Sequence, residues 1–314
     1  ANFCFFKNCK NSFIIYNTFA KAAATVRRQY LFEDAMPELP EVETIKSAIQ
    51  KGIGDSNITR VSVNNNRFRE IIPEDFAAKI TGARITGYRR IAKYIVISLD
   101  NGLSIVWHLG MSGRVKISDS LPDKLDKHDH VVIETSGGVL IYNDARRFGM
   151  MTYCISDKLA EFPAFKHTGI DPFDQRLTAE YLYEKLKNKK TAIKIALLDQ
   201  EIICGIGNIY ASEALFGASI LPTREAGSLS RTECGKLLKA VREVLEKAIK
   251  AGGSTLRDYR KPDGSLGYFQ NQHCVYNKTG QPCPGCTCSP ARTGGIRKIV
   301  QGGRSTFYCP TKQK

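Results

Sequence analysis

The spacing of apolar residues changes once along this chain, near residue 153, and that change constrains the fold more than any other feature. Before it, β-branched residues alternate with polar ones in short runs, separated by turn signals such as Asp-Asn-Gly at 100–102 and Ser-Gly-Gly at 136–138. Alternation with a period of two is typical of strands with one buried face. The sequence therefore predicts an antiparallel β-sandwich or barrel. Its expected strands are 58–63, 83–88, 93–99, 103–109, 130–135 and 139–144.

Beyond the sandwich the apolar spacing becomes helical. Ser230 and Glu233 have the spacing of a capping box, and the apolar face behind them ends at a Gly-Gly pair, which predicts a long helix within 230–253. Residues 191–216 predict two helices joined by a glycine-rich turn. The expected domains are 37–165, 176–271 and 272–314, with residues 166–175 as the linker.

A short helix is expected ahead of the sandwich, within 40–52. Pro40 suits the first helical turn, aliphatic residues fall on one face, and Gly52 is expected to end the helix. Residues 1–36 contain five basic residues and no acid before Glu33, so they resemble a presequence, an expression remnant or translated upstream sequence. We expect them not to belong to the fold.

Charge indicates the class of partner. The chain of 314 residues has a formal net charge of +15, and from Ser254 onward ten lysines and arginines stand against two aspartates, a net charge of +8. A basic segment of this kind suits a polyphosphate partner. No apolar run reaches the roughly 18 residues that a membrane span needs. We expect a soluble cytoplasmic monomer that does not bind membranes.

Half of the ten cysteines lie near the C-terminal end, which indicates a metal site in a reducing compartment. These five are Cys274, Cys283, Cys286, Cys288 and Cys309.

Seven motifs occur in an order that resembles the formamidopyrimidine-DNA glycosylase family. They are MPELPEVETIK at 36, LGMSGR at 109, DARRFG at 144, KKTAIK at 189, GIGNIYASEALF at 205, GYFQ at 267 and CPGC…GRSTFYCP at 283–310. The resemblance implies a sandwich followed by a helix-two-turn-helix domain and a β-hairpin zinc finger. It also implies a bifunctional DNA glycosylase and lyase that acts on damaged double-stranded DNA.

Pro37 is the expected nucleophile once Met36 is removed. An α-amine has a pKa of roughly 8, so a far larger fraction of it is unprotonated near pH 7 than of a lysine. A secondary amine on the sugar C1′ forms a cationic iminium, which acidifies the C2′ hydrogen and promotes strand cleavage. The family gives its N-terminal proline this role. It gives the adjacent Glu38 the role of general acid.

Two lysines are assigned by the resemblance. Lys93, which we expect on a strand, matches the active-site lysine of the family, near the damaged base and its phosphate. Lys190 matches a phosphate-binding lysine.

Three further residues match the family's void-filling side chains, namely Met111, Arg146 and Phe148. An enzyme that acts on a base must extrude it from the duplex and fill the gap. Side chains of these types are suited to that role.

The GIGN turn lacks the spacing of a phosphate-binding P-loop. The resemblance implies instead that Asn208 and exposed backbone N–H groups of this turn contact DNA phosphates. Arg304 resembles the phosphate-binding arginine at the tip of the finger. The five histidines lack metal-pair spacing and are interpreted as structural or close to DNA.

The finger departs from the family pattern. Cys283, Cys286 and Cys309 match three zinc ligands, but Lys312 stands where the fourth cysteine is expected. Three outcomes follow: a substitute thiolate from Cys288, a weak three-cysteine site, or a hairpin without zinc that is held by packing. We expect one structural zinc, bound more weakly than in a four-cysteine finger.

The sequence thus predicts a glycosylase and AP lyase for oxidised purines, 8-oxoguanine and formamidopyrimidines, that cleaves the strand by β,δ-elimination in base excision repair. The alternatives are an endonuclease VIII-like enzyme for oxidised pyrimidines and a DNA-binding protein without catalysis. Residues 254–264 favour purines, because they resemble the loop that covers a flipped purine in the family. Catalysis is lost if Pro37 stays within a peptide bond.

Overall fold

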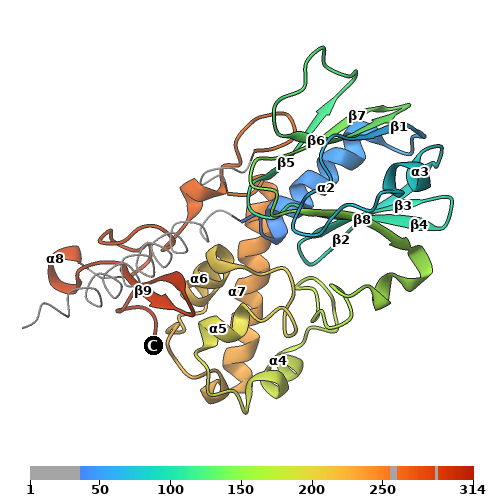
Figure 1. The fold of residues 1–314 in the computed structure, drawn as a ribbon. Helices are drawn as coiled ribbons and strands as arrows, with labels where there is room; N and C mark the ends of the chain where they lie inside the picture. The colour runs from blue at the N-terminus through green and yellow to red at the C-terminus, as the bar shows by residue number, and fades with distance from the viewer. Residues whose placement is uncertain (1–35, 255–259, 287–288) are drawn as a thin grey trace, which may run out of the picture.

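A computed structural model describes residues 36–254, 260–286 and 289–314. The leader 1–35, residues 255–259 of the expected purine-covering loop and Cys288 lie outside the described residues. The chain forms a β-sandwich and then a helical part that carries a β-hairpin, as Figure 1 shows. This arrangement confirms the predicted fold class.

Two four-stranded antiparallel sheets form the sandwich, in the orders β1-β6-β7-β5 and β2-β3-β4-β8. The first sheet contains β1 (Ile58–Val63), β5 (Gly113–Ser118), β6 (Asp129–Thr135) and β7 (Gly138–Asp144). The second contains β2 (Ile85–Ile91), β3 (Tyr94–Leu99), β4 (Leu103–His108) and β8 (Met150–Ile155). Trp107 of β4 meets Tyr142 of β7 edge to face across the core, with ring centroids 4.9 Å apart. Strands β5 and β8 and the short helix α3 (Phe76–Ile80) were not among the predicted elements.

Helix α2 (Leu39–Ile53) connects the cores of the two parts. Val42 packs in the sandwich core, whereas Leu39 packs among the buried residues of the helical part. The helix continues past Gly52, where the sequence predicted its end, because Ile53 is still buried and the positive φ of 61° falls at Gly54. The two parts therefore share one rigid element at the start of the fold.

The helical part is built around α6 (Asn208–Gly217), whose residues 208–216 are all buried. The helical part also contains α4 (Ala179–Leu186), α5 (Ile193–Leu197), α7 (Arg231–Lys250) and the 3₁₀ turns η3 (Ala226–Ser228) and η4 (Phe269–Gln272). Helix α8 (Pro290–Thr293) precedes the hairpin, and the 3₁₀ turn η2 (Ser156–Glu161) packs on β4 and β8 of the sandwich. Ser230 and Glu233 form the predicted capping box of α7, and the predicted helix pair on either side of the glycine turn is α5 and α6.

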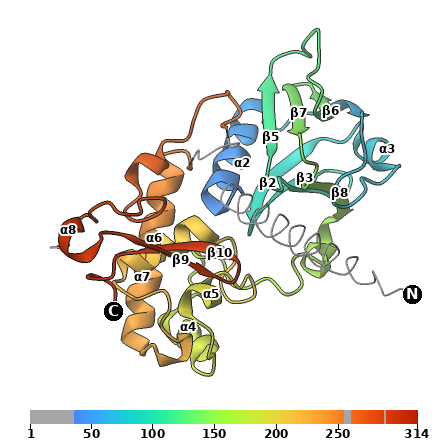
Figure 2. The ribbon, with the colours of Figure 1, turned by 60° about the vertical axis from the view of Figure 1, so that its left-hand side comes forward.

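The hairpin consists of β9 (Arg297–Gln301) and β10 (Arg304–Tyr308), joined by Gly302 and Gly303 at φ 54° and 78°. Strand β10 contacts α6, and Figure 2 shows the hairpin against the helical part. Phe307 packs edge to face on Tyr276, with ring centroids 4.9 Å apart. Among the described residues, no helix is long and apolar enough to cross a membrane.

Candidate active site between the two domains

Pro37 and Glu38 lie at the start of α2, where the sandwich meets the helical part, and both are buried. Pro37 directly precedes Glu38, the residue that caps α2. A nucleophile and an acid at adjacent positions can reach the same sugar from one side.

The Glu38 carboxyl is held by the N-terminus of α6. Its Oε1 accepts a hydrogen bond of 2.9 Å from the Ile209 N–H, and its Oε2 accepts one of 3.4 Å from the Tyr210 N–H. Gly207 permits this approach, because a Cβ there would lie 2.2 Å from the Glu38 Cδ. Burial raises the pKa of Glu38, and Lys93 and these backbone bonds act in the opposite direction. A raised pKa suits an acid that must keep a proton to donate.

The glycine turn was expected to have exposed backbone N–H groups, but residues 205–208 are all buried and the Gly205 N–H donates a 2.8 Å bond to the Gln200 side chain. The N–H groups of Ile209 and Tyr210 are occupied by Glu38. The positive end of α6 therefore binds a carboxylate of the protein itself.

Lys93 lies in the turn between β2 and β3, which corrects the prediction that it lies on a strand. Ala92 begins this turn with a φ of 51°, which lets two residues reverse the chain, and Lys93 is half-buried. Burial lowers the pKa of Lys93, Glu38 and Glu41 raise it, and Arg304 lowers it. The structure thus brings Lys93 into the electrostatic field of both carboxyls and of the hairpin arginine.

Glu41 is a buried acid that the sequence did not identify as a site residue. Its carboxyl accepts hydrogen bonds from the Tyr210 hydroxyl at 2.5 Å, the Ser254 N–H at 2.7 Å and the Glu38 N–H at 2.9 Å. Burial, and then the charge of Glu38, raise the pKa of Glu41 to about 7. Its position three residues after Glu38 was the available signal, because an acid there can reach back to the capping residue.

The hydrogen-bonded chain continues beyond Glu41. The Ser254 hydroxyl lies 3.2 Å from the Tyr210 hydroxyl and 3.1 Å from Nε2 of His273, which is also buried. Ser254 is the last described residue before 255–259. The polar chain therefore connects the start of α2 to the beginning of the loop that the sequence associates with purine recognition.

The three expected void-filling residues lie together. An Arg146 guanidinium nitrogen is 3.5 Å from the Met111 sulfur, and the Arg146 Cζ lies 4.8 Å from the centroid of the Phe148 ring. Phe148 is 46% exposed, which is unusual for a phenylalanine and argues against a place in the core. Met111 lies between β4 and β5, and the other two lie between β7 and β8.

Asp144 joins the two loops that carry these residues, and the sequence did not single it out. It is fully buried, and its carboxyl accepts bonds from the Ser112 hydroxyl at 2.5 Å, the Gly149 N–H at 2.9 Å and the Arg146 N–H at 3.3 Å. Gly110, at φ +64°, lets the loops touch, because a Cβ there would lie 2.4 Å from the Gly149 nitrogen. The Asp144 carboxylate therefore holds together the two loops that carry Met111, Arg146 and Phe148.

Asn208 is buried at the start of α6 and is bound to its surroundings through both polar side-chain atoms. Its Oδ1 accepts a 2.6 Å bond from the Lys194 ammonium, and its Nδ2 donates a 2.9 Å bond to the Ser305 carbonyl in β10. Lys194 is fully buried, whereas Lys190, the lysine that the sequence favoured, is exposed. The structure thus places Lys194, four residues further along the same motif, beside Asn208.

Arg304 lies at the tip of the hairpin, as expected. It lines a cavity of about 410 Å³ together with Lys189 and Thr191, which lie in the loop before α5. The charge of Arg304 lowers the pKa of Lys93, so the two side chains lie within electrostatic range of each other.

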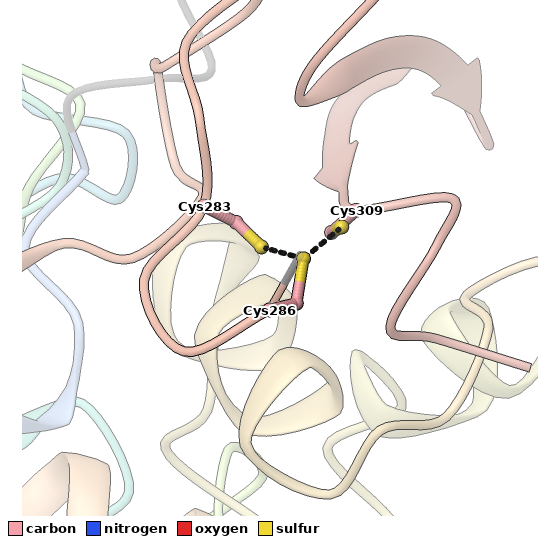
Figure 3. Close-up of side chains that lie close together, drawn as sticks. All are labelled: Cys283, Cys286 and Cys309. Atoms are coloured by element: carbon pink, nitrogen blue, oxygen red, sulfur yellow. Dashed lines mark hydrogen bonds between the residues drawn. The ribbon is translucent and has the colours of Figure 1, made fainter. Parts of the chain in front are cut away.

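The three finger cysteines converge, as Figure 3 shows. The sulfur of Cys286 lies 2.9 Å from that of Cys283 and 3.6 Å from that of Cys309, and all three lie within 4.8 Å of one another. Tetrahedral zinc–thiolate bonds of about 2.3 Å separate two sulfurs by roughly 3.8 Å, so the Cys286–Cys309 distance fits such a site and the Cys283–Cys286 distance is shorter than it requires. The three side chains could occupy three positions of a metal site if the Cys283 and Cys286 sulfurs moved slightly apart. Lys312 does not supply the fourth, because its ammonium lies over the Phe216 ring, 3.9 Å from the centroid.

Comparison with known proteins agrees with this geometry. Residues 36–151 match the model of the formamidopyrimidine-DNA glycosylase N-terminal domain, and residues 168–260 match that of the formamidopyrimidine-DNA glycosylase H2TH domain. The formamidopyrimidine-DNA glycosylase of Rhodospirillum centenum is 46% identical over 290 residues, which cover 89% of this chain and all of that protein. Two complexes of the Lactococcus lactis enzyme, one of a point mutant with Fapy-dG DNA and one with abasic-site DNA, superpose with a TM-score of 0.80. Each is 33% identical, and the match covers 88% of this chain and all of theirs.

Proposed function

Because the chain belongs to the formamidopyrimidine-DNA glycosylase family and is a DNA glycosylase and AP lyase of base excision repair, we propose that it excises oxidised purines through Pro37. The observation that carries this proposal is the position of Pro37 beside Glu38, whose buried carboxyl is bound by α6 and lies in the field of Lys93. The expected substrates are 8-oxoguanine and formamidopyrimidines in duplex DNA.

The reaction begins at the sugar. The Pro37 nitrogen attacks C1′, and the damaged base departs with the electrons of the glycosidic bond. The proton that the Pro37 nitrogen then releases is taken up by the departing base. Glu38 protonates the ring oxygen O4′ as the C1′–O4′ bond breaks, which leaves a cationic iminium between Pro37 and C1′. Loss of a C2′ proton then expels the 3′ phosphate, and a second elimination expels the 5′ phosphate. Hydrolysis of the iminium releases the sugar fragment and restores the amine.

Lys93 completes the catalytic group. Its charge lies close to both carboxyls, and a partly exposed ammonium at this place can bind the phosphate beside the lesion. Met111, Arg146 and Phe148 fill the gap that the extruded base leaves. Their mutual contacts and the exposure of Phe148 support this role.

Phosphate binding is the role that we propose for Asn208, Arg304 and Lys190. Arg304 and Lys190 would contact the DNA backbone as charges. The Asn208 side chain is held by Lys194, Tyr276 and the Ser305 carbonyl, so Asn208 would contact a phosphate through its backbone N–H at the start of α6. We also propose that residues 166–175 link the two domains. The protein is further proposed to act as a monomer on DNA in the cytoplasm.

A structural zinc is proposed for the finger, held by Cys283, Cys286 and Cys309. With three protein ligands in place of four, the affinity is expected to be lower than in a complete site.

Borohydride trapping on an 8-oxoguanine duplex tests the proposal, because reduction of the iminium makes a permanent crosslink. Protein that begins at Pro37 should crosslink, and protein that keeps Met36 and the residues before it should bind the duplex without crosslinking, since an amide nitrogen has no available lone pair. Equal crosslinking by the two forms would contradict the assignment of Pro37. An oxidised-pyrimidine duplex serves as the matched lesion, and preferential crosslinking to it would contradict the purine assignment.

A further inference from the structure

The segment after Cys309 is the part of the sequence in which the fourth metal ligand of the finger is expected and missing. Lys312 occupies the position of that ligand in the sequence, and its side chain cannot serve as a thiolate would. Residues 310–314, here called the tail, nevertheless have a defined place against the helical part. The contacts of the tail indicate what holds the hairpin in position.

Lys312 packs on α6. Its ammonium lies 3.9 Å from the centroid of the Phe216 ring, and Phe216 is buried near the end of α6. A cation over an aromatic face is attracted by the ring quadrupole, more strongly where water is excluded. The residue that replaces the cysteine thus connects the finger to α6 without a metal.

Gln313 closes the tail into a turn and ties that turn to the helical part. Its side chain is 2% exposed. Its Oε1 accepts a 2.8 Å bond from the Cys309 N–H, and its Nε2 donates a 2.9 Å bond to the Ile220 carbonyl. A second bond, 3.1 Å long, runs from the Gln313 N–H to the Cys309 carbonyl. Cys309, the last metal-site cysteine, is therefore fixed by protein groups.

Lys314 extends the attachment through its backbone. Its N–H donates a 3.1 Å bond to the Ser219 carbonyl, and its carbonyl accepts a 3.0 Å bond from the Leu221 N–H. The side chain of Lys314 is exposed. These two backbone bonds pair the tail with the loop after α6, as in a short β-bridge.

The remaining borders of the finger are also attached to the helical part by buried polar groups. Lys194 donates a 3.0 Å bond to the Thr306 hydroxyl in β10, beside the Asn208–Ser305 bond. At the start of the finger, the Glu213 carboxyl accepts bonds of 2.8–2.9 Å from the N–H groups of three consecutive residues, Cys274, Val275 and Tyr276. None of these contacts involves a cysteine sulfur.

We propose that the tail takes over the structural role of the fourth zinc ligand, so that Lys312 and Gln313 keep the hairpin, and with it Arg304, in place whether or not a metal is bound. The three cysteines can still hold an ion, but the position of Arg304 does not depend on it. The consequence for DNA binding rests on the proposed function, whereas the structural claim about the hairpin does not.

Hydrogen exchange and DNA binding, each measured before and after chelation, test this proposal on protein that begins at Pro37. Zinc content is followed by atomic absorption. Exchange is read at the β10 amides in the free protein, and affinity is read with a duplex that carries an uncleavable abasic-site analogue. In chelated wild-type protein, the β10 exchange rates and the affinity for the duplex should both stay within about twofold of those of the untreated protein. Gln313→Ala should speed β10 exchange at least about tenfold and weaken binding in the chelated state.

Lys312→Met tests the cation–aromatic contact with little loss of side-chain length, so the variant should fold even if Gln313→Ala does not. It should speed β10 exchange by about threefold to tenfold. Lys314→Met is the matched control, since it removes the same charge two residues away and leaves the backbone bonds, and it should behave as wild type. The proposal is overturned if chelation alone loosens β10 as much as Gln313→Ala does, or if the two Lys→Met variants behave alike. A protein that keeps β10 protected but does not bind damaged DNA would contradict only the proposed function.

Discussion

Glu38 Oε1 accepts a 2.9 Å hydrogen bond from the backbone N–H of Ile209, so the carboxyl next to Pro37 is held by the other domain. The two residues are 171 positions apart in the chain. With the roles proposed above, we expect base excision to depend on the helical part even though Pro37, Glu38 and Lys93 all lie in the first part. A shift of α6 would misplace the acid before it affected the sandwich.

Replacing Glu38 by Gln should separate binding from excision. The amide oxygen can still accept the Ile209 N–H, but the side chain has no proton to give to O4′. Single-turnover excision of 8-oxoguanine should fall by about 100-fold to 10,000-fold, with little change in the affinity for the duplex. Glu43→Gln is the control on the same helix, because Glu43 pairs with Lys46 and Arg90 outside the catalytic group. Excision at the wild-type rate by Glu38→Gln would assign the acid to another residue.

Glu41 should make stability fall as the pH rises. Its pKa is about 7 in the folded protein against an ordinary value of 4.5, so the folded state binds more protons than the unfolded state between these values. The stability is fully present below pH 4.5 and is lost as the pH rises through 7, by on the order of 3 kcal/mol. Glu38, whose pKa is also raised, acts with the same sign.

Urea unfolding at about pH 5 and about pH 8 measures this effect in the chain that keeps Met36, where no proline amine titrates. Glu41→Gln should flatten the dependence relative to wild type, because glutamine does not ionise. Glu246→Gln, at an exposed position of α7, should leave it unchanged. If wild type, Glu41→Gln and Glu246→Gln were all more stable at the higher pH, and by the same margin, Glu41 would be excluded as the cause.

The elements that the sequence predicted correctly are those with a strong local signal. The alternation in 58–63 and 103–109 and the capping box of Ser230 and Glu233 each lie within a few residues, and each matches an element of the structure. Strand β8 was missed because Met-Met-Thr-Tyr-Cys-Ile has few β-branched residues. Lys93 was misplaced because its turn begins with Ala92 at a positive φ and contains none of the usual turn residues.

The site residues that the sequence missed are defined by contacts between distant positions. The bonds of Glu41 to Tyr210 and Ser254 span 169 and 213 residues, and the bond of Asp144 to Ser112 spans 32. No periodicity or capping signal covers such distances. Motif resemblance named the groups that are expected to meet DNA, whereas the buried groups packed behind them became visible only in the fold.

Asp144→Asn should loosen the void-filling cluster. Asparagine replaces one carboxylate oxygen with an NH₂ group, which would face a donor, either the Gly149 N–H or the Ser112 hydroxyl and Arg146 N–H. We expect a loss of about 2 kcal/mol in unfolding free energy. Binding of a lesion-containing duplex should weaken more than binding of an undamaged one, because only the former needs the gap filled. A competition assay with the two duplexes measures this ratio, and an unchanged ratio in a destabilised variant would limit Asp144 to a structural role.

Lys190 and Lys194 should respond differently to salt, because one is an exposed charge and the other a buried positioning group. A lysine that binds a phosphate releases counterions, so Lys190→Ala should weaken binding to all sequences and reduce the slope of log K against log salt by about one, as Arg304→Ala should. Lys194→Met keeps the length of the side chain but removes the donor to Asn208 and Thr306. It should weaken binding by about tenfold through a misoriented Asn208 while the salt slope stays that of wild type. Lys236→Met, at an exposed position of α7, is the control for a lost lysine. If Lys194→Met lowers the slope by about one and Lys190→Ala does not, the phosphate contact belongs to Lys194, and the positioning role is wrong.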